Sequence, residues 1–227
     1  MWLPHLIAQL NYSEMQRMGL QISAEDIYSV NQSSLKDAVV HFNGGCTGEL
    51  ISSQGLLLTN HHCGYSQIQS HSTLEDNYLK DGFWAASREE ELPNKGLYAA
   101  IIKEIKDVSN DVLSGTTTEM AEAERDSIIQ SNRQMLLAKM KEAYPKLEFE
   151  LKDFFFGNQY LLISKTIYND VRLVGAPPSS VGKYGADTDN WVWPRHTGDF
   201  SIFRIYADVN NQPADYSADN VPFKPAR

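Results

Sequence analysis

Three short apolar segments follow one another in the first third of the chain, and they constrain the fold more than any other feature. They are AVVHF (38–42), GELIS (48–52) and GLLLT (55–59), and glycine, serine, asparagine or glutamine residues separate them. Apolar runs of this length between turn-forming residues are typical of strands joined by tight turns. We therefore expect consecutive strands of an antiparallel sheet, with turns at 44–45 and 52–55.

Further strands are expected downstream. LYAAIIKEI (97–105) predicts another strand, with a helix as the alternative. LEFELKDFFF (147–156) and QYLLISKTIYNDVRLVG (159–175) flank Gly157-Asn158, which predicts a long hairpin. FSIFRIYAD (200–208) alternates apolar and polar residues and predicts one more strand.

The segment 116–143 has a helical pattern instead. Thr116-x-x-Glu119 matches a capping box, apolar residues follow at helical spacings, and Pro145 ends the segment. We expect one helix of more than twenty residues here, and shorter helical segments at 11–20 and 23–29. The predicted fold class is mainly β with helices.

Composition and charge exclude several functions. The 227 residues are 42% hydrophobic and carry a formal net charge of −9, from 29 acidic and 20 basic residues. No cluster of Lys and Arg is present, which argues against binding nucleic acid or an anionic membrane. No apolar run approaches the roughly 18 residues of a membrane span.

The two ends of the sequence carry expectations about processing and length. MWLPHLIAQLNY has neither a basic region nor a long apolar region, so we expect no intact signal peptide. If the protein is exported, we expect the signal to have been removed. The final segment, NNQPADYSADNVPFKPAR, has the composition of a loop, which predicts that the chain is a piece of something longer.

The two cysteines leave two interpretations open. Cys46 and Cys63 are 63 − 46 = 17 positions apart, and each lies at a predicted strand boundary, which suits a disulfide. Two buried free thiols are the alternative, and the cysteine count does not choose between them. No metal site is expected, because Cys-x-x-Cys and His-x-x-x-His are both absent. We expect no cofactor either.

The first candidate for chemistry is the histidine pair in GLLLTNHHCG (55–64). A histidine after a strand is most often a hydrogen-bonded loop residue, but a rigidly held imidazole also suits a general base. Adjacent side chains point in different directions, so at most one of the pair faces a site. We select His62, which begins the predicted turn, and expect His61 to be structural.

The second candidate lies in WVWPRHTGDFSIFRIYAD (191–208). Asp199 precedes a predicted strand and is either a turn-capping residue or the carboxylate that orients a histidine. It lies 199 − 62 = 137 residues after His62, so only the fold can bring the two together. His196 is a competing base, and Asn190 with Trp191 offers an amide and a flat ring for a substrate pocket.

These segments resemble a known family. Leu-Thr-Asn-His-His-Cys is similar to the signature around the catalytic histidine of chymotrypsin-fold serine peptidases. Longer segments resemble the bacterial dipeptidyl-peptidase 7 and dipeptidyl-peptidase 11 family, serine peptidase family 46. They span nearly the whole chain: MWLP, SAEDIYSVNQSSLKDAVVHFNGGCTGELIS, GLLLTNHHCGYSQIQSHS, DGFWA and DTDNWVWPRHTGDFSIFRIYAD.

The resemblance implies a fold and a set of roles. Residues 1–227 would form the N-terminal half of a chymotrypsin-like double β-barrel with one long helix inserted, without the second barrel and the inserted helical domain. His62 would be the catalytic base and Asp199 the catalytic aspartate. Asn190 and Trp191 would hold the free α-amino group of a peptide. The resemblance also implies a bridge between Cys46 and Cys63 and a periplasmic, cell-surface or secreted location.

One departure from the family changes the expected activity. The family's nucleophile lies in a Gly-Asn-Ser-Gly-Ser segment, and no Gly-x-Ser-Gly occurs in these 227 residues. We therefore expect an N-terminal fragment of a dipeptidyl aminopeptidase that is inactive alone. The alternative is a non-catalytic binding or assembly module with a relic His/Asp pair. A complete endopeptidase using Ser179, Ser180 or Ser201 is the third possibility, but none of these serines lies in a recognisable oxyanion turn.

The expected partners follow from this interpretation. They are peptides with a free N-terminus, and neither nucleic acid nor a membrane is expected as a partner. We expect the full-length parent to be a homodimer. The isolated chain should self-associate through the apolar face that normally docks on the second barrel.

Overall fold

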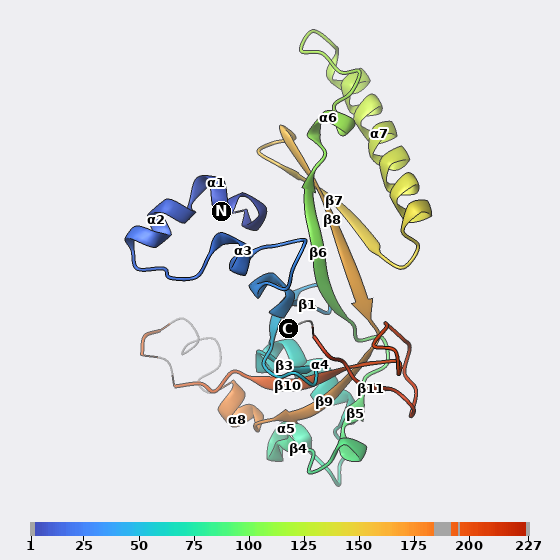
Figure 1. Cartoon of the computed structure of the whole chain (residues 1–227). Coiled ribbons are helices and arrows are strands. Elements are labelled where there is room, and N and C mark those ends of the chain that lie inside the picture. The colour runs from blue at the N-terminus through green and yellow to red at the C-terminus, as the bar shows by residue number, and fades with distance from the viewer. Residues whose placement is uncertain (1–2, 184–191, 195, 226–227) are drawn as a thin grey trace. The chain divides into compact units, whose positions relative to one another are not determined.

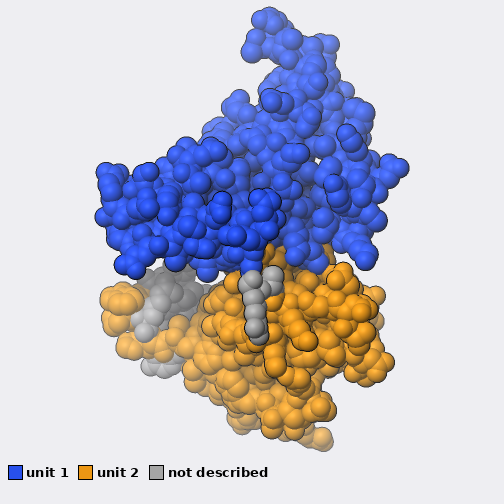
Figure 2. Space-filling model, viewed as in Figure 1, with its two compact units in different colours: residues 1–36, 102–166 blue, residues 37–101, 167–227 orange. Residues whose placement is uncertain are grey.

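The chain folds into two compact units (Figures 1 and 2). The computed structural model describes residues 3–183, 192–194 and 196–225. The first unit contains Met1–Lys36 and Ile102–Thr166, and the second contains Asp37–Ile101 and Ile167–Arg227. Both are built on antiparallel strands, and helices accompany them, which confirms the predicted class of mainly β with helices.

The second unit holds most of the sheet. Its strands follow the spatial order β4-β9-β10-β3-β2-β1 and then the first three residues of β6, while β11 pairs with β10 and β5 with β9. The strands are β1 (Val39–Phe42), β2 (Cys46–Leu50), β3 (Leu56–Thr59), β4 (Phe83–Trp84), β5 (Leu92–Pro93), β6 (Ala99–Asp107), β9 (Asp170–Ala176), β10 (Ser201–Ala207) and β11 (Val221–Pro222). The helices are α4 (His61–His71), α5 (Tyr78–Asp81), η3 (Arg88–Glu90) and α8 (Ser179–Gly182).

The three apolar segments at 38–42, 48–52 and 55–59 form β1, β2 and β3. Asn43 and Gly44 both have a positive φ and make the tight turn between β1 and β2. The core of the unit consists of buried apolar side chains, many of them from this sheet, with Phe42, Leu57 and Phe203 among the largest. Because burial of such side chains is the main stabilising term, the short strands gain their stability from this core.

The first unit contains the β7–β8 hairpin and the long helix. Its strands are β7 (Glu148–Phe154), β8 (Gln159–Tyr168) and the remainder of β6. Its helices are η1 (Pro4–Leu6), α1 (Ile7–Leu10), α2 (Tyr12–Arg17), α3 (Ala24–Ile27), η2 (Leu35–Ala38, which continues into the second unit), α6 (Ser109–Val112) and α7 (Glu122–Ala143). A second apolar core, which includes Val112, Ile129 and Leu162, packs α6 and α7 against the strands. Among the described helices, none is both long and apolar enough to cross a bilayer.

Two predicted boundaries were wrong. Helix α7 begins at Glu122 rather than at Thr116, and Ala121 occupies its N-cap position, so Thr116-x-x-Glu119 is not its capping box. The predicted strand 159–175 is interrupted at Asn169. The reason is a change of partner, because β8 pairs with β7 whereas β9 pairs with β10.

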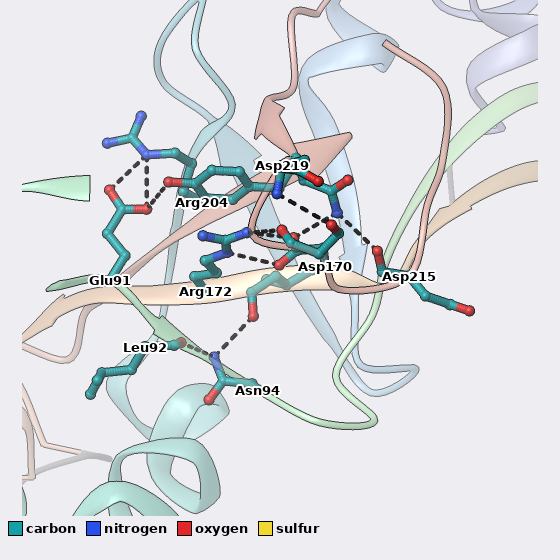
Figure 3. Close-up of polar contacts among 12 residues, drawn as sticks. Glu91, Leu92, Asn94, Asp170, Arg172, Arg204, Asp215 and Asp219 are labelled. Atoms are coloured by element: carbon teal, nitrogen blue, oxygen red, sulfur yellow. Dashed lines mark hydrogen bonds and ion pairs between the residues drawn. The ribbon is translucent and has the colours of Figure 1, made fainter. Parts of the chain in front are cut away.

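A buried polar network joins β5, β9 and β10 (Figure 3). Arg204 of β10 donates to the Glu91 carboxylate at 2.9 Å, and the Tyr206 hydroxyl donates to the same carboxylate at 2.8 Å. Burial, and next the bond to Glu91, raise the pKa of Tyr206 well above its ordinary value, so the hydroxyl remains a donor. Buried charges of this kind are tolerated only when paired and hydrogen-bonded.

The same network fixes the segment after β10. Arg172 of β9 binds the buried Asp170 through two nitrogens, at 2.9 and 2.8 Å. Its guanidinium lies 3.7 Å from the ring centroid of Tyr206, which is stacking distance. Arg172 also donates to the carbonyl of Ser217, and Asn220 donates to Asp170 at 2.9 Å. These contacts hold β10 in place, and Asp199 lies just before this strand.

Candidate active site

Strand register brings the two candidate residues together. β10 pairs with β3 in antiparallel fashion, with Ser201 opposite Thr59. The residues that follow β3 therefore lie beside the residues that precede β10. His62 comes three residues after Thr59, and Asp199 comes two residues before Ser201. The fold thus brings His62 and Asp199 together, as predicted, although they are 137 positions apart in the sequence.

The histidine pair lies on a helix rather than in a turn. Helix α4 begins at His61, directly after the N-cap residue Asn60, so the predicted turn is the first turn of an eleven-residue helix. Only three of its residues are buried, namely His61, Gly64 and Ile68. Because most of the helix is polar, its sequence lacks the apolar period that predicts a helix.

His62 and Asp199 form a hydrogen-bonded pair. The imidazole Nδ1 lies 2.7 Å from Asp199 Oδ2, and the backbone N–H of His62 donates to Oδ1 at 3.1 Å. The His62 side chain is 65% exposed and that of Asp199 is 19% exposed. Within the described residues, Nε2 of His62 makes no hydrogen bond. A histidine held at Nδ1 by a carboxylate, with Nε2 accessible, can take a proton from a hydroxyl nucleophile.

A disulfide anchors the helix beside this pair. Cys46 at the start of β2 and Cys63 in the first turn of α4 are bonded, with their Cα atoms 6.1 Å apart. This bond decides against the alternative of two free thiols. The ligand atoms of Cys46, His62 and Cys63 lie within 4.8 Å of one another. Both sulfurs are committed to the disulfide, so they do not offer the thiolates that a zinc site of this kind needs.

Close packing between α4 and β10 leaves no room for a side chain at Gly64. A Cβ atom there would lie 2.7 Å from Ser201 Oγ and 3.0 Å from the Phe203 ring. The Ser201 hydroxyl donates to the carbonyl of Asn60 at 2.8 Å. Helix α4 and strand β10 are therefore closely packed next to the contact between His62 and Asp199.

His61, the residue before His62, is buried. Its side chain is 1% exposed, and a Cβ at Gly182 of α8 would lie 2.4 Å from its ring. Burial lowers the pKa of His61, which favours the neutral imidazole. This environment agrees with the structural role expected for His61.

The remaining candidates have different outcomes. Asn190 and Trp191 lie outside the described residues, so their predicted contact with a substrate amine stays a prediction. His196 is exposed. Sequence reasoning missed Asn60, whose side-chain Nδ2 lies 3.2 Å from Asp199 Oδ2. The only available signal was its place between an apolar strand and the histidine pair.

Comparison with known proteins identifies relatives over the whole chain. The family model described as Peptidase S46 matches residues 1–227. An Asp/Glu-specific dipeptidyl-peptidase of Capnocytophaga gingivalis is 58% identical over 226 residues, which cover 99% of this chain and 32% of that protein. Dipeptidyl-peptidase 7 of the same species is 49% identical over 225 residues, covering 99% and 31%. The chain spans about a third of the length of these curated relatives.

Solved structures give the same relationship. The crystal structure of Porphyromonas endodontalis DPP11 in complex with the dipeptide Arg-Asp matches with a TM-score of 0.90 and 52% identity, covering 100% of this chain and 33% of that one. The complex of the same protein with Arg-Glu matches with a TM-score of 0.88 and 51% identity, also covering 100% and 33%. Together with the antiparallel sheet, this likeness agrees with the predicted portion of a chymotrypsin-like fold.

Proposed function

This chain belongs to peptidase family S46, and on that premise we propose that it is part of a serine-type dipeptidyl-peptidase. The parent enzyme would release dipeptides from the free N-terminus of peptides. One observation carries the proposal, namely the 2.7 Å contact between His62 Nδ1 and Asp199 Oδ2. This is the arrangement of a general base and its orienting carboxylate.

The proposed mechanism is acyl transfer. Nε2 of His62 takes the proton of a serine hydroxyl as that oxygen attacks the scissile carbonyl, and later gives it to the leaving amine. Asp199 accepts from Nδ1–H, fixes the tautomer and stabilises the imidazolium. The nucleophile would come from outside these 227 residues, since no Gly-x-Ser-Gly occurs among them. Asn190 and Trp191 would hold the substrate's α-amino group, which sets the distance to the cleaved bond.

The test compares the 227-residue chain with the full-length gene product on a fluorogenic dipeptide substrate. We expect no turnover by the 227-residue chain, because it lacks the nucleophile segment. We expect turnover by the full-length product, and a loss on the order of a million-fold for its His62→Ala variant. If the 227-residue chain turned over the substrate and His62→Ala abolished that turnover, the nucleophile would lie within these 227 residues. This result would contradict the proposal that the nucleophile comes from outside them.

A non-catalytic module with a relic His/Asp pair is the competing function. The coding sequence beyond Arg227 separates the two. A Gly-Asn-Ser-Gly-Ser segment downstream supports the peptidase, whereas a stop codon soon after Arg227 supports the module.

For substrate preference, we propose that the parent cleaves after acidic residues. The support is that the relatives named Asp/Glu-specific dipeptidyl-peptidase are 52 to 58% identical to this chain, whereas those named dipeptidyl-peptidase 7 are 46 to 49% identical. The full-length product should then have a higher kcat/KM for a dipeptide substrate ending in Asp than for one ending in Phe. The reverse order would assign it the other preference.

We further propose that the protein works in an oxidising compartment, such as the periplasm or the cell surface. The bond between Cys46 and Cys63 supports this, because disulfides persist in exported proteins and are rare in the cytosol. Alkylation of cell fractions under non-reducing conditions tests the proposal. Recovery of the protein in the cytosolic fraction with both thiols free would contradict it.

A further inference from the structure

Asn60 immediately precedes α4, and we propose that it is a positioning residue for the His62–Asp199 pair. The inference rests on the proposed function, because it gives Asn60 a part in catalysis by that pair. Asn60 Nδ2 lies 3.2 Å from Asp199 Oδ2 and 3.2 Å from the Asp199 carbonyl oxygen. Both partners are acceptors only, so the amide must present its NH₂ group to them.

The side chain of Asn60 bonds to the Asp199 carboxylate and does not cap the helix. It occupies the N-cap of α4, where an asparagine normally accepts a hydrogen bond from the backbone N–H of the second or third helical residue. Its side chain makes no such bond. The N–H of His62, the second helical residue, donates instead to Asp199 Oδ1 at 3.1 Å. Asp199 therefore caps the helix, and a helix N-terminus attracts a negatively charged group.

The backbone of Asn60 is fixed by the strand that follows Asp199. Its carbonyl accepts a hydrogen bond from Ser201 Oγ at 2.8 Å and from the N–H of Gly64 at 3.3 Å. Ser201 is fully buried and lies two residues after Asp199. The backbone that carries the Asn60 amide is thus held in place before any substrate arrives, as a supporting residue of a catalytic pair requires.

The contacts predict which kinetic parameter depends on Asn60. Asp199 Oδ2 receives both the imidazole Nδ1 and the Asn60 amide, and Oδ1 receives the His62 N–H. Removing the amide takes one of the two donors from Oδ2, so the carboxylate and the imidazole bonded to it lose a restraint on orientation. Because the contacts of Asn60 are to Asp199 and to residues of α4 and β10, the effect should fall on kcat rather than on KM.

The experiment uses the full-length gene product with Asn60→Ser and Asn60→Ala. Serine keeps a favourable N-cap residue but lacks the NH₂ group, so it separates helix capping from the contact with Asp199. We expect kcat to fall about 10- to 100-fold in both variants, as for a lost hydrogen bond to a charged group. KM and the thermal midpoint of Asn60→Ser should equal those of the wild type. The proton NMR resonance of His62 Nδ1–H should shift in Asn60→Ser, which a purely structural role would not require.

Three results would overturn the inference. The variant His62→Ala shows whether the proposed function fails as well. Wild-type kcat and an unshifted resonance in Asn60→Ser, while His62→Ala is inactive, would remove the role of Asn60 and leave the peptidase function in place. A fall in kcat matched by a lower thermal midpoint would limit Asn60 to a role in stability. Wild-type turnover by His62→Ala would refute the proposed function and the inference with it.

Discussion

At the scale of single residues, two adjacent histidines occupy opposite environments. His61 is almost fully buried against α8, whereas the side chain of His62 is 65% exposed and bonded to Asp199. Consecutive residues of a helix are about 100° apart around its axis, which is enough to send one ring into the core and the other toward solvent. One local sequence, His-His, therefore supplies both a packing residue and a candidate base.

The buried histidine predicts a pH dependence of stability. Burial lowers the pKa of His61 in the folded chain, so the unfolded chain binds more protons below its own pKa of about 6.5. The stabilisation by neutral His61 is complete above that pH and is lost as the pH falls toward the folded-state pKa. Denaturant unfolding should show a smaller decrease between pH 7 and pH 5 for His61→Gln than for the wild type. Equal decreases would contradict this account of His61.

Gly64 gives a second prediction at this scale. In a helix interior, replacing glycine by alanine normally stabilises by about 0.5–1 kcal/mol. At Gly64 the new Cβ would lie within 3.0 Å of both Ser201 Oγ and the Phe203 ring. Both contacts come from buried residues, so we expect Gly64→Ala to destabilise the chain by about 1–3 kcal/mol instead. Urea unfolding measures the sign, and an increase in stability would show that α4 and β10 are less closely packed.

At the scale of elements, the turn between β7 and β8 contains two unfavourable residues. Phe155, Phe156 and Gly157 all have a positive φ, between 51° and 79°. Phe156 is fully exposed, so its ring gains nothing from packing. A side chain other than glycine in this left-handed region costs about 1–2 kcal/mol.

Replacing Phe156 should therefore stabilise the hairpin. We expect Phe156→Gly to raise the free energy of unfolding by about 0.5–1 kcal/mol, because glycine adopts a positive φ without strain. Phe156→Ala is the matched control, since it removes the ring but keeps the Cβ atom, and it should stay within about 0.5 kcal/mol of the wild type. A loss of stability in both variants would mean that the ring makes contacts that stabilise the hairpin.

The elements also show what the sequence could predict. The turn residues around β1, β2 and β3 identified three strands, and the helical spacing after residue 120 identified α7. Helix α4 was missed because its polar composition carries no apolar period, and the break at Asn169 was missed because the apolar run continues across it. The residues themselves suggested His62 as a base and Asp199 as a possible orienting carboxylate, and the family resemblance implied these roles for the two. The contact of Asn60 depends on a side-chain orientation that no spacing encodes.

At the scale of the whole molecule, the chain carries apolar side chains that its own fold does not cover. Phe155 is 64% exposed next to the fully exposed Phe156. Self-association of the isolated chain stays a prediction, and clusters of exposed apolar residues favour it. Light scattering over a range of concentrations should show an average mass that rises with concentration. A constant mass equal to one chain of 25.6 kDa would contradict the prediction.

The proposed activity depends on the orientation that Asp199 gives to His62. The most direct measurement is kcat of the full-length gene product with Asp199→Asn, compared with the wild type at neutral pH. An asparagine keeps the shape of the side chain but favours the wrong imidazole tautomer, so we expect kcat to fall about 10⁴-fold. A kcat within a few-fold of the wild-type value, in a variant with the same thermal midpoint, would contradict the assignment of His62 and Asp199 as the base and its orienting carboxylate.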